Sequence, residues 1–302
     1  MKVLIVGLGS ISKKHISAIR RMSSEAKIYA LRSGNSTNDE IGVRNIYTLT
    51  DAPEDLDFCI ISNPTSEHGD TIKLLASLKK PLLIEKPVLS SIDEVEELNL
   101  VIKKSKITTY VGCNLRFHPI IERLREEMNE RKPIEMNVYC GSYLPEWRPE
   151  QDYRKVYSAK SSLGGGVHLD LIHEIDYTTY LLGYPRTFNS YLGKKSSLEI
   201  DSNDVAHYIL EYDHTSVFIT LNYYRREAKR QIECVWEDGV WIADLIKGSI
   251  INEKGDVIFM KPFDVLETYY AQLNYFWECI QEERKPMNSF SEATEILKVC
   301  LN

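Results

Sequence analysis

A run of three glycines, residues 164–166, leads into a stretch that carries an acid and a histidine three residues apart. Because residues i and i+3 lie on one face of an α-helix, Asp170, His173 and Tyr177 are predicted to form one polar stripe of a helix. The glycines let a ligand approach the backbone closely. A histidine beside an acid can transfer protons, so the stretch predicts a proton-transfer site. The alternative is a buried histidine that is satisfied by a helical neighbour.

A second candidate for chemistry is Lys86, which follows the apolar run at residues 81–84 as part of Glu85-Lys86-Pro87. A lysine at the carboxyl end of a parallel strand can direct its charge at a bound nicotinamide. A positive charge there would stabilise an oxygen that becomes negative during a reaction. The alternative is a surface salt bridge between Lys86 and Glu85.

A glycine turn follows the first apolar run of the chain, residues 2–6, and a basic helix follows the turn. Strand, glycine turn and helix form the context of a dinucleotide-binding fingerprint, in which the pyrophosphate lies at the helix N-terminus. Ser12 stands where the third glycine or alanine of this fingerprint usually lies. The turn residues predicted to contact the dinucleotide are Gly7, Gly9, Ser10 and Ile11.

The end of the second predicted strand, residues 27–31, indicates which dinucleotide is bound. NAD-binding chains place an acid here for the ribose 2′-hydroxyl, whereas this chain has Leu31, followed by Arg32 and Ser33. Arginine with a hydroxyl suits a 2′-phosphate through charge-assisted hydrogen bonds. We therefore predict NADP in preference to NAD. If Arg32 is only a solvated loop residue, NAD is the alternative.

Strand-like and helical stretches alternate through the first part of the chain. Strands at residues 57–61, 81–84 and 108–112, separated by helices at 69–78 and 91–104, predict an α/β fold with a doubly wound parallel sheet. Polar residues after such strands line the ligand crevice. The further cofactor candidates at these positions are Asn63, Pro64, Thr65, His68, Glu85, Lys86 and Asn114.

Residues 142–157, here called the aromatic segment, are rich in aromatic residues and arginines. Arginine forks bind carboxylates or phosphates, and aromatic faces stack on sugar rings. The substrate-binding candidates, besides Asp170 and His173, are Arg116, Tyr143, Trp147, Arg148, Tyr153, Arg154 and Tyr157. A cross-subunit arm is the alternative, because tryptophan, tyrosine and arginine are also enriched at interfaces, and both roles can hold together.

The second part of the chain is richer in strands. The predicted strands are residues 205–212, 216–224, 230–237, 239–245, 249–252 and 257–260. A helix at residues 266–283 has an apolar stripe that is typical of a core. We predict a Rossmann domain at residues 1–118 and an α+β domain at residues 119–302.

The composition limits the class of partner and the cellular compartment. A net charge of −7 disfavours nucleic acid. The six cysteines are spread singly without a CxxC pair, so no metal site is expected. The chain opens directly into a strand and has no apolar run long enough for a membrane helix. We expect a reduced, cytoplasmic protein.

Four motifs together resemble the Gfo/Idh/MocA oxidoreductases. They are the glycine turn with His15, Glu85-Lys86-Pro87, Asn114-Leu115-Arg116-Phe117-His118-Pro119, and the three glycines with Asp170, His173 and Asp176. The resemblance implies a Rossmann domain and a second domain whose open, mostly antiparallel sheet carries the substrate site and the oligomer contact. It also implies that Lys86 bonds the reacting hydroxyl. The family more often has a longer spacing between acid and histidine, and the shorter one is similar to a branch that modifies sugars and nucleotide sugars.

The function predicted is hydride transfer between NADP, or NAD, and a secondary alcohol of a sugar, cyclitol or nucleotide sugar that can be anionic. Lys86 is expected to stabilise the alkoxide, and His173, oriented by Asp170, to take the proton; both must reach one substrate oxygen. A homodimer or homotetramer is expected. The alternatives are a relative that oxidises transiently for hydrolysis or epimerisation and retains its cofactor, a non-catalytic nucleotide-binding sensor, and a structural protein.

Overall fold

The computed structural model describes residues 1–34 and 39–302. The chain forms two compact units: Met1–Asn114 with Val265–Leu297, and Leu115–Asp264 with Lys298–Asn302. The division predicted at residue 118 therefore differs from this grouping at residues 265–297. The physical reason is the apolar stripe of that segment, because Tyr269, Leu273 and Phe276 are buried in the core of the first unit.

The first unit contains a six-stranded sheet whose strand pairs are all parallel, in the order β3-β2-β1-β4-β5-β6. The strands are β1 Lys2–Val6, β2 Lys27–Leu31, β3 Val43–Ile46, β4 Phe58–Ile61, β5 Leu82–Glu85 and β6 Thr109–Gly112. β4, β5 and β6 are buried at every position, as expected for parallel strands that are covered on both faces. The doubly wound sheet predicted from the sequence is confirmed.

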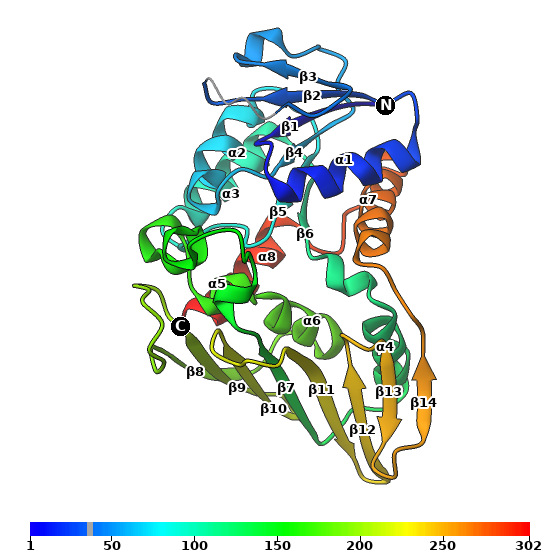
Figure 1. Cartoon of the computed structure of the whole chain (residues 1–302). Helices are drawn as coiled ribbons and strands as arrows, with labels where there is room; N and C mark the ends of the chain where they lie inside the picture. The colour runs from blue at the N-terminus through cyan, green and yellow to red at the C-terminus, as the bar shows by residue number, and fades with distance from the viewer. Residues whose placement is uncertain (35–38) are drawn as a thin grey trace. The chain divides into compact units, whose positions relative to one another are not determined.

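Helices cover both faces of this parallel sheet (Figure 1). They are α1 Ser10–Met22, α2 His68–Ala76, α3 Val95–Ser105 and α7 Val265–Gln281. One apolar cluster joins α1 and α7 to the strands through residues such as Ile16, Ile60 and Phe276. This packing holds the N-terminus of α1 next to the end of β1, where the glycine turn lies.

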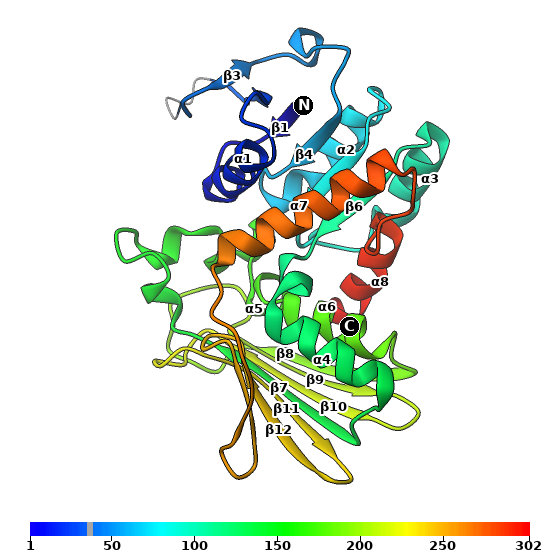
Figure 2. The same ribbon diagram turned by 90° about the vertical axis from the view of Figure 1, so that its right-hand side faces the viewer.

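The second unit contains an eight-stranded sheet in the order β14-β13-β12-β11-β7-β10-β9-β8. Its strands are β7 Glu135–Gly141, β8 Thr187–Gly193, β9 Val205–Glu211, β10 Ser216–Asn222, β11 Lys229–Trp236, β12 Gly239–Asp244, β13 Ser249–Asn252 and β14 Val257–Met260. All pairs are antiparallel except β7 with β10. α4 Pro119–Glu130, α5 Val167–Asp170 and α6 His173–Leu182 lie on one face (Figure 2). The predicted mostly antiparallel sheet is confirmed.

The stretch after the three glycines is not one helix. It divides into α5 and α6 at Leu171, where φ is −102° and ψ is 30°, so the predicted single helix with one polar stripe is wrong. An amphipathic helix buries only one face, whereas every residue from 164 to 178 is buried here.

The remaining elements are short, apart from α8 Phe290–Leu301. The 3₁₀ helices are η1 Leu49–Asp51, η2 Thr65–Glu67, η3 Asn114–Phe117, η4 Leu144–Glu146, η5 Tyr153–Lys155, η6 Tyr157–Ala159 and η7 Ser161–Leu163. All six cysteines are buried, and none of them forms a disulfide bond. Among the described residues, no helix combines the length and the apolar character needed to cross a bilayer.

Candidate functional site

The turn between β1 and α1 is closed by Ser12. The Ser12 hydroxyl donates to the Gly7 carbonyl at 3.0 Å and accepts from the Gly9 N–H at 3.1 Å. Gly7 has φ +86°, and a Cβ there would lie 2.8 Å from the backbone of Asn63. From the sequence, Ser12 was given only the place of the third glycine or alanine of the fingerprint, whereas in the structure its hydroxyl fixes the turn.

The turn has room for an anionic group. A Cβ added at Gly9 would meet nothing within 4 Å, and the first turn of α1, which contains Ser10 and Ile11, carries no acidic residue. The N-terminus of a helix binds phosphate through its free N–H groups and its dipole. β1 and β4 are neighbours at the point where the strand order reverses, which is where dinucleotides bind in this fold. The residues therefore fit a dinucleotide pyrophosphate.

Arg32 is held against the neighbouring strand. Its side chain is buried, and Nη1 donates to Asn45 Oδ1 at 3.2 Å. Asn45 in turn donates to Asp39 at 2.6 Å. Arg32 is thus not a solvated loop residue, whereas Ser33 is exposed. Sequence analysis missed Asn45, because the short and partly polar strand β3 was not predicted.

Buried contacts brace the turn after β4. Asn63 Nδ2 donates to Thr71 Oγ1 at 2.8 Å. The ring nitrogens of His68 lie 3.1 Å from the carbonyls of Val88 and Asn63. Burial lowers the pKa of His68, which is 1% exposed. His68 therefore supports the turn from within the unit. The turn's surface is formed by Pro64, which is exposed, and Thr65, which is half-buried.

Glu85 lies between α1 and Lys86. Its Oε1 is 2.6 Å from Nε2 of His15, which is fully buried on α1. Its Oε2 accepts from the Lys86 backbone N–H at 3.2 Å. The rings of His15 and Tyr269 pack in a T-shaped arrangement, with their centres 5.5 Å apart. The dinucleotide helix and the segment that carries Lys86 are thus fastened together by one buried carboxylate.

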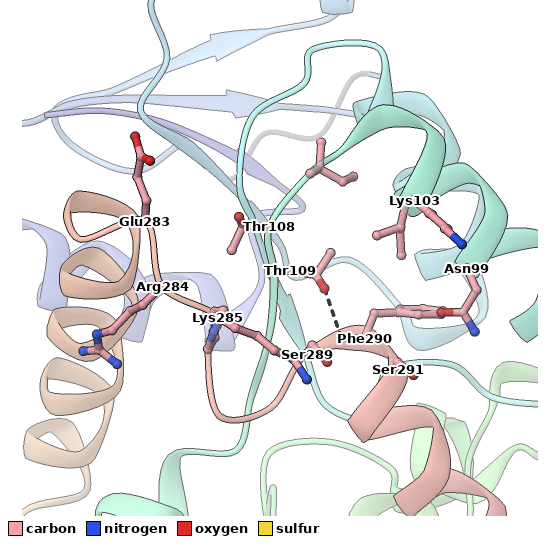
Figure 3. A pocket seen from close by; sticks show the side chains of 13 residues that line it. Asn99, Lys103, Thr108, Thr109, Glu283, Arg284, Lys285, Ser289, Phe290 and Ser291 are labelled. Atoms are coloured by element: carbon pink, nitrogen blue, oxygen red, sulfur yellow. Dashed lines mark hydrogen bonds between the residues drawn. The ribbon is translucent and has the colours of Figure 1, made fainter.

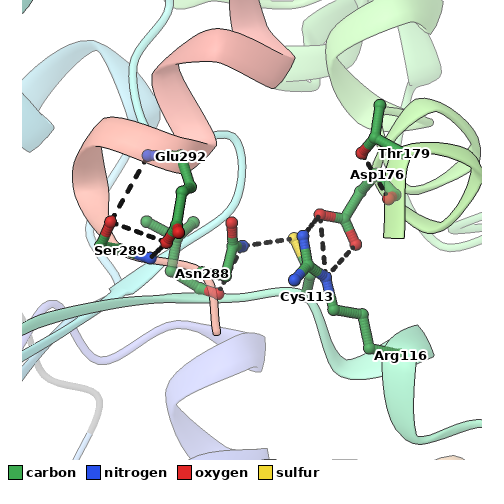
Figure 4. Close-up of polar contacts among 8 residues, drawn as sticks. Cys113, Arg116, Asp176, Thr179, Asn288, Ser289 and Glu292 are labelled. Carbon is green, nitrogen blue, oxygen red and sulfur yellow. Dashed lines mark hydrogen bonds and ion pairs between the residues drawn. The ribbon is translucent and has the colours of Figure 1, made fainter. Parts of the chain in front are cut away.

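Polar contacts also fix the end of β6. Asn114 is buried, and its Nδ2 donates to Thr268 Oγ1 at 2.7 Å. Asn288 Nδ2 donates to the Val111 carbonyl at 3.0 Å and lies 3.5 Å from Cys113 Sγ (Figure 4). Asn114, predicted to contact the cofactor, is therefore engaged with α7 in this structure.

In the second unit, two tyrosines hold Asp170. The Tyr157 hydroxyl donates to Asp170 Oδ1, and the Tyr223 hydroxyl donates to Oδ2. Burial, together with the Asp170 charge, raises the pKa of both tyrosines well above the ordinary value. Both therefore remain neutral donors near pH 7. Tyr223, which follows β10, was missed because it is 53 positions from its partner.

A buried ion pair fixes the start of α6, where His173 is the first residue. The side chain of Glu174 is fully buried and accepts from Arg230 Nε at 2.6 Å and from Nη2 at 3.1 Å. Burial alone would lower the pKa of Arg230, but the Glu174 charge raises it above the ordinary value. Nearby on α5, burial lowers the pKa of His168 to about 4. Glu174 and Arg230 were both missed by the sequence analysis.

Arg116 forms a buried fork with Asp176 (Figure 4). Nε lies 3.2 and 3.0 Å from the two carboxylate oxygens, and Nη2 lies 2.6 Å from Oδ1. The residues are 5% and 1% exposed. Arg116 was predicted to bind substrate, and in this structure its guanidinium joins η3 to α6.

The aromatic segment contains a small hollow lined by Leu144, Trp147, Arg148, Tyr153, Val156 and Ser158. Its volume of about 10 Å³ is near the lower limit for one water molecule. Trp147 donates from Nε1 to Ser142 Oγ at 2.8 Å. The structure therefore brings Trp147, Arg148 and Tyr153 together.

The two other predicted residues of the aromatic segment have different contacts. The Arg226 guanidinium lies 3.6 Å from the centre of the Tyr143 ring. Arg154 is exposed and pairs with Asp152 at 2.8 Å and with Glu199 at 3.0 Å. Exposed ion pairs of this kind contribute little to stability.

A pocket of about 500 Å³ lies at the edge of the parallel sheet, between α3, the start of β6 and the segment before α8 (Figure 3). In its wall the Phe290 N–H donates to Thr109 Oγ1 at 3.0 Å. Lys285 of the lining pairs with Glu292 at 2.9 Å. The pocket is at the amino end of β6, whereas Rossmann ligands bind at the carboxyl ends of strands. It is therefore separate from the glycine turn.

Both parts of the chain match one family. Residues 1–113 match the description "Oxidoreductase family, NAD-binding Rossmann fold", and residues 135–300 match "Oxidoreductase family, C-terminal alpha/beta domain". The protein therefore belongs to the Gfo/Idh/MocA family of oxidoreductases. The resemblance of the four sequence motifs is thereby confirmed.

Individual relatives are distant. The uncharacterized oxidoreductase YrbE of Bacillus subtilis is 27% identical over 190 residues, covering 59% of this chain and 53% of the relative. Myo-inositol 2-dehydrogenase of Thermotoga maritima is 25% identical over 196 residues, covering 61% of this chain and 55% of the relative. The matched segments thus span about half the length of these relatives. The structure of UDP-N-acetylglucosamine 3-dehydrogenase GnnA from Acidithiobacillus ferrooxidans shares the fold, with a TM-score of 0.79, 19% identity, and coverage of 100% of this chain and 95% of that chain.

Proposed function

We propose that the chain is an NAD(P)-dependent oxidoreductase that transfers a hydride to or from a secondary alcohol of a sugar, cyclitol or nucleotide sugar. The observation that carries the proposal is the glycine turn, in which Gly9 is open beside a helix N-terminus without acids. The family and the names of its relatives, an inositol dehydrogenase and a nucleotide-sugar dehydrogenase, support the substrate class.

Three side chains have roles in the proposed reaction. The nicotinamide ring supplies the hydride acceptor or donor when the dinucleotide is bound. Lys86 stabilises the negative charge that develops on the substrate oxygen. His173 accepts the proton from that oxygen, and the Asp170 carboxylate orients the imidazole. The buried contacts of Glu85 with His15 and of Glu174 with Arg230 support these roles, because they restrict the segments on which Lys86 and His173 lie.

NADP is the preferred dinucleotide in this proposal. Leu31 stands at the position where an acid usually binds the ribose 2′-hydroxyl of NAD. Arg32 and Ser33 after it offer a cation and a hydroxyl for a 2′-phosphate. The contact with Asn45 restricts the Arg32 side chain. We assign the dinucleotide function to residues 1–118, with residues 265–297 packed in the same unit, and the substrate function to the rest of residues 119–302. An exposed Arg148 in the aromatic segment suits an anionic substrate.

We also propose a homodimer or homotetramer that assembles through the sheet face opposite α4, α5 and α6. On this face Tyr191, Ile209 and Phe218 are 45%, 42% and 39% exposed. A cytoplasmic, reducing location suits six buried cysteines that form no disulfide bond.

The test is a titration with each dinucleotide, followed by turnover assays with UDP-N-acetylglucosamine, its uronic acid, myo-inositol and glucose. We expect absorbance at 340 nm to change with at least one substrate and added dinucleotide. Turnover without added dinucleotide would favour transient oxidation with a retained cofactor. Tight dinucleotide binding without turnover across the panel would favour a sensor, and no binding of either dinucleotide would refute the proposal.

A further inference from the structure

Each oxygen of the Asp170 carboxylate accepts a hydrogen bond from a different tyrosine. Tyr157 begins η6 and reaches Oδ1, while Tyr223 follows β10 and reaches Oδ2. Asp170 is 5% exposed and Tyr223 is fully buried. We propose that Tyr157 and Tyr223 are positioning residues that set the orientation of Asp170 and, with it, the conformation of the aromatic segment. The inference rests on the proposed function, in which Asp170 orients the proton acceptor.

Both hydroxyls keep their protons and donate hydrogen bonds to the Asp170 carboxylate. Burial, and then the Asp170 charge, raises the pKa of both tyrosines well above the ordinary value, so neither releases its proton near neutral pH. Hydrogen bonds from a hydroxyl to a carboxylate are short and about twice as strong as neutral ones. With one donor on each oxygen, rotation of the carboxylate would break both bonds. The plane of the Asp170 carboxylate is therefore fixed from two sides.

The same tyrosines also hold the two ends of the aromatic segment. At its start, the Leu144 N–H donates to the Tyr223 carbonyl at 2.9 Å, and the Trp147 ring packs edge-on against the Tyr223 ring at 5.3 Å. At its end, Tyr157 donates directly to Asp170. A displacement of the segment at either end would therefore disturb the acid. The segment carries the substrate-binding candidates Trp147, Arg148 and Tyr153, so their placement and that of Asp170 are coupled.

The first test compares Tyr157→Phe and Tyr223→Phe with Tyr208→Phe. Tyr208 is a matched control, because its buried hydroxyl donates to the Cys300 carbonyl at 2.8 Å, in the same unit. The loss of a hydrogen bond to a charged group is expected to reduce kcat roughly 10- to 100-fold in the first two variants. The dissociation constant for NADP, measured by protein fluorescence, should change less than about twofold. Tyr208→Phe should lose thermal stability but keep kcat within about twofold.

The pH profile of kcat separates positioning from a general loss of structure. In the proposed reaction His173 accepts the proton, so the acidic limb of the profile reports that step. A carboxylate without its hydroxyl donor keeps more negative charge for the imidazole that it orients, which favours the protonated ring, so the limb should move to higher pH. We expect this shift in Tyr157→Phe and Tyr223→Phe but not in Tyr208→Phe. An unshifted profile together with wild-type kcat in both variants would refute the positioning role while the proposed function stands.

A second readout needs no substrate. Trypsin can cleave after Arg154 and Lys155, which are exposed in the aromatic segment. Well below the melting temperature, cleavage at these sites should be at least about threefold faster in Tyr157→Phe than in the wild type and Tyr208→Phe. Tyr223→Phe should be cleaved at the wild-type rate, because it keeps the backbone and ring contacts with Leu144 and Trp147. Equal rates in all four proteins would refute the anchoring of the segment. If the wild type neither binds a dinucleotide nor turns over, the proposed function fails, and proteolysis still decides the anchoring.

Discussion

The buried pair of Arg116 and Asp176 allows a quantitative test. From the sequence, Arg116 was predicted to bind substrate, whereas in the structure it pairs with Asp176. Three donor–acceptor distances of 2.6 to 3.2 Å join the two side chains, and both are at least 95% buried. Removing one partner leaves an uncompensated buried charge, which costs about 3–5 kcal/mol. For a unit of this size, such a loss lowers the melting temperature by about 6–20 °C. We expect this decrease in Arg116→Met and in Asp176→Leu.

A double-mutant cycle distinguishes the pair from two independent sites. The variant that combines Arg116→Met with Asp176→Leu replaces both charges by apolar side chains, and such replacements are often nearly neutral. The unfolding free energies, from urea denaturation, should therefore show a coupling of about 2 kcal/mol or more. Arg186→Met is the control, because Arg186 is 72% exposed and pairs with Asp213 at the surface. Its melting temperature should change by less than about 2 °C.

The refuting result is a change in catalysis without a change in stability. If Arg116→Met raises the KM for the substrate while the melting temperature falls by less than about 3 °C, Arg116 contacts substrate and its assignment to the pair is wrong. Additive losses in the double variant would equally contradict a direct interaction.

Three further outcomes are expected. Gly7→Ala should weaken dinucleotide binding at least about tenfold in a fluorescence titration, because the added Cβ would lie 2.8 Å from the Asn63 backbone. Gly255→Ala is the control, because Gly255 has the same φ of +86° but no atom within 4 Å of an added Cβ, and this variant should bind the dinucleotide normally. Equal losses of affinity in the two variants would contradict the argument. Arg32→Ala should raise the dissociation constant of NADP roughly 10- to 100-fold and that of NAD less than about threefold, and equal losses would remove Arg32 from 2′-phosphate recognition. Burial lowers the pKa of His118 from 6.5 to about 4. The neutral imidazole therefore contributes about 3 kcal/mol to the free energy of unfolding above pH 6.5, and this contribution is lost as the pH falls towards 4. His118→Asn retains an N-cap acceptor for the Ile120 N–H, and its unfolding free energy should depend less on pH over that range; an unchanged dependence would contradict this.

Local pattern was sufficient to predict most of both sheets. Apolar runs gave β1, β4, β5 and β6, and runs of strand-forming residues gave β9 to β14. β3 was missed because Arg44 and Asn45 interrupt its apolar character. β7 was also missed, although its alternating buried residues Met136, Val138 and Cys140 carry the usual signal.

Long-range pairing explains what the sequence could not show at the site. Tyr223 lies 53 positions from Asp170, and Arg230 lies 56 positions from Glu174. No local spacing predicts such partners, because the folding of the antiparallel sheet brings them to α5 and α6. The break at Leu171 was not predicted either, because the spacing of Asp170, His173 and Tyr177 also fits one continuous helix.

The central claim, that Lys86 and His173 act in one hydride transfer, is tested most directly by turnover of Lys86→Ala and His173→Ala with the substrate identified in the panel. General acid–base catalysis contributes about 10²- to 10⁴-fold to a reaction rate. The kcat of each variant, measured from the absorbance change at 340 nm, should therefore be at least about 100-fold lower than that of the wild type. Titration should show NADP binding within about threefold of the wild type. Wild-type turnover in either variant would contradict the role assigned to that residue.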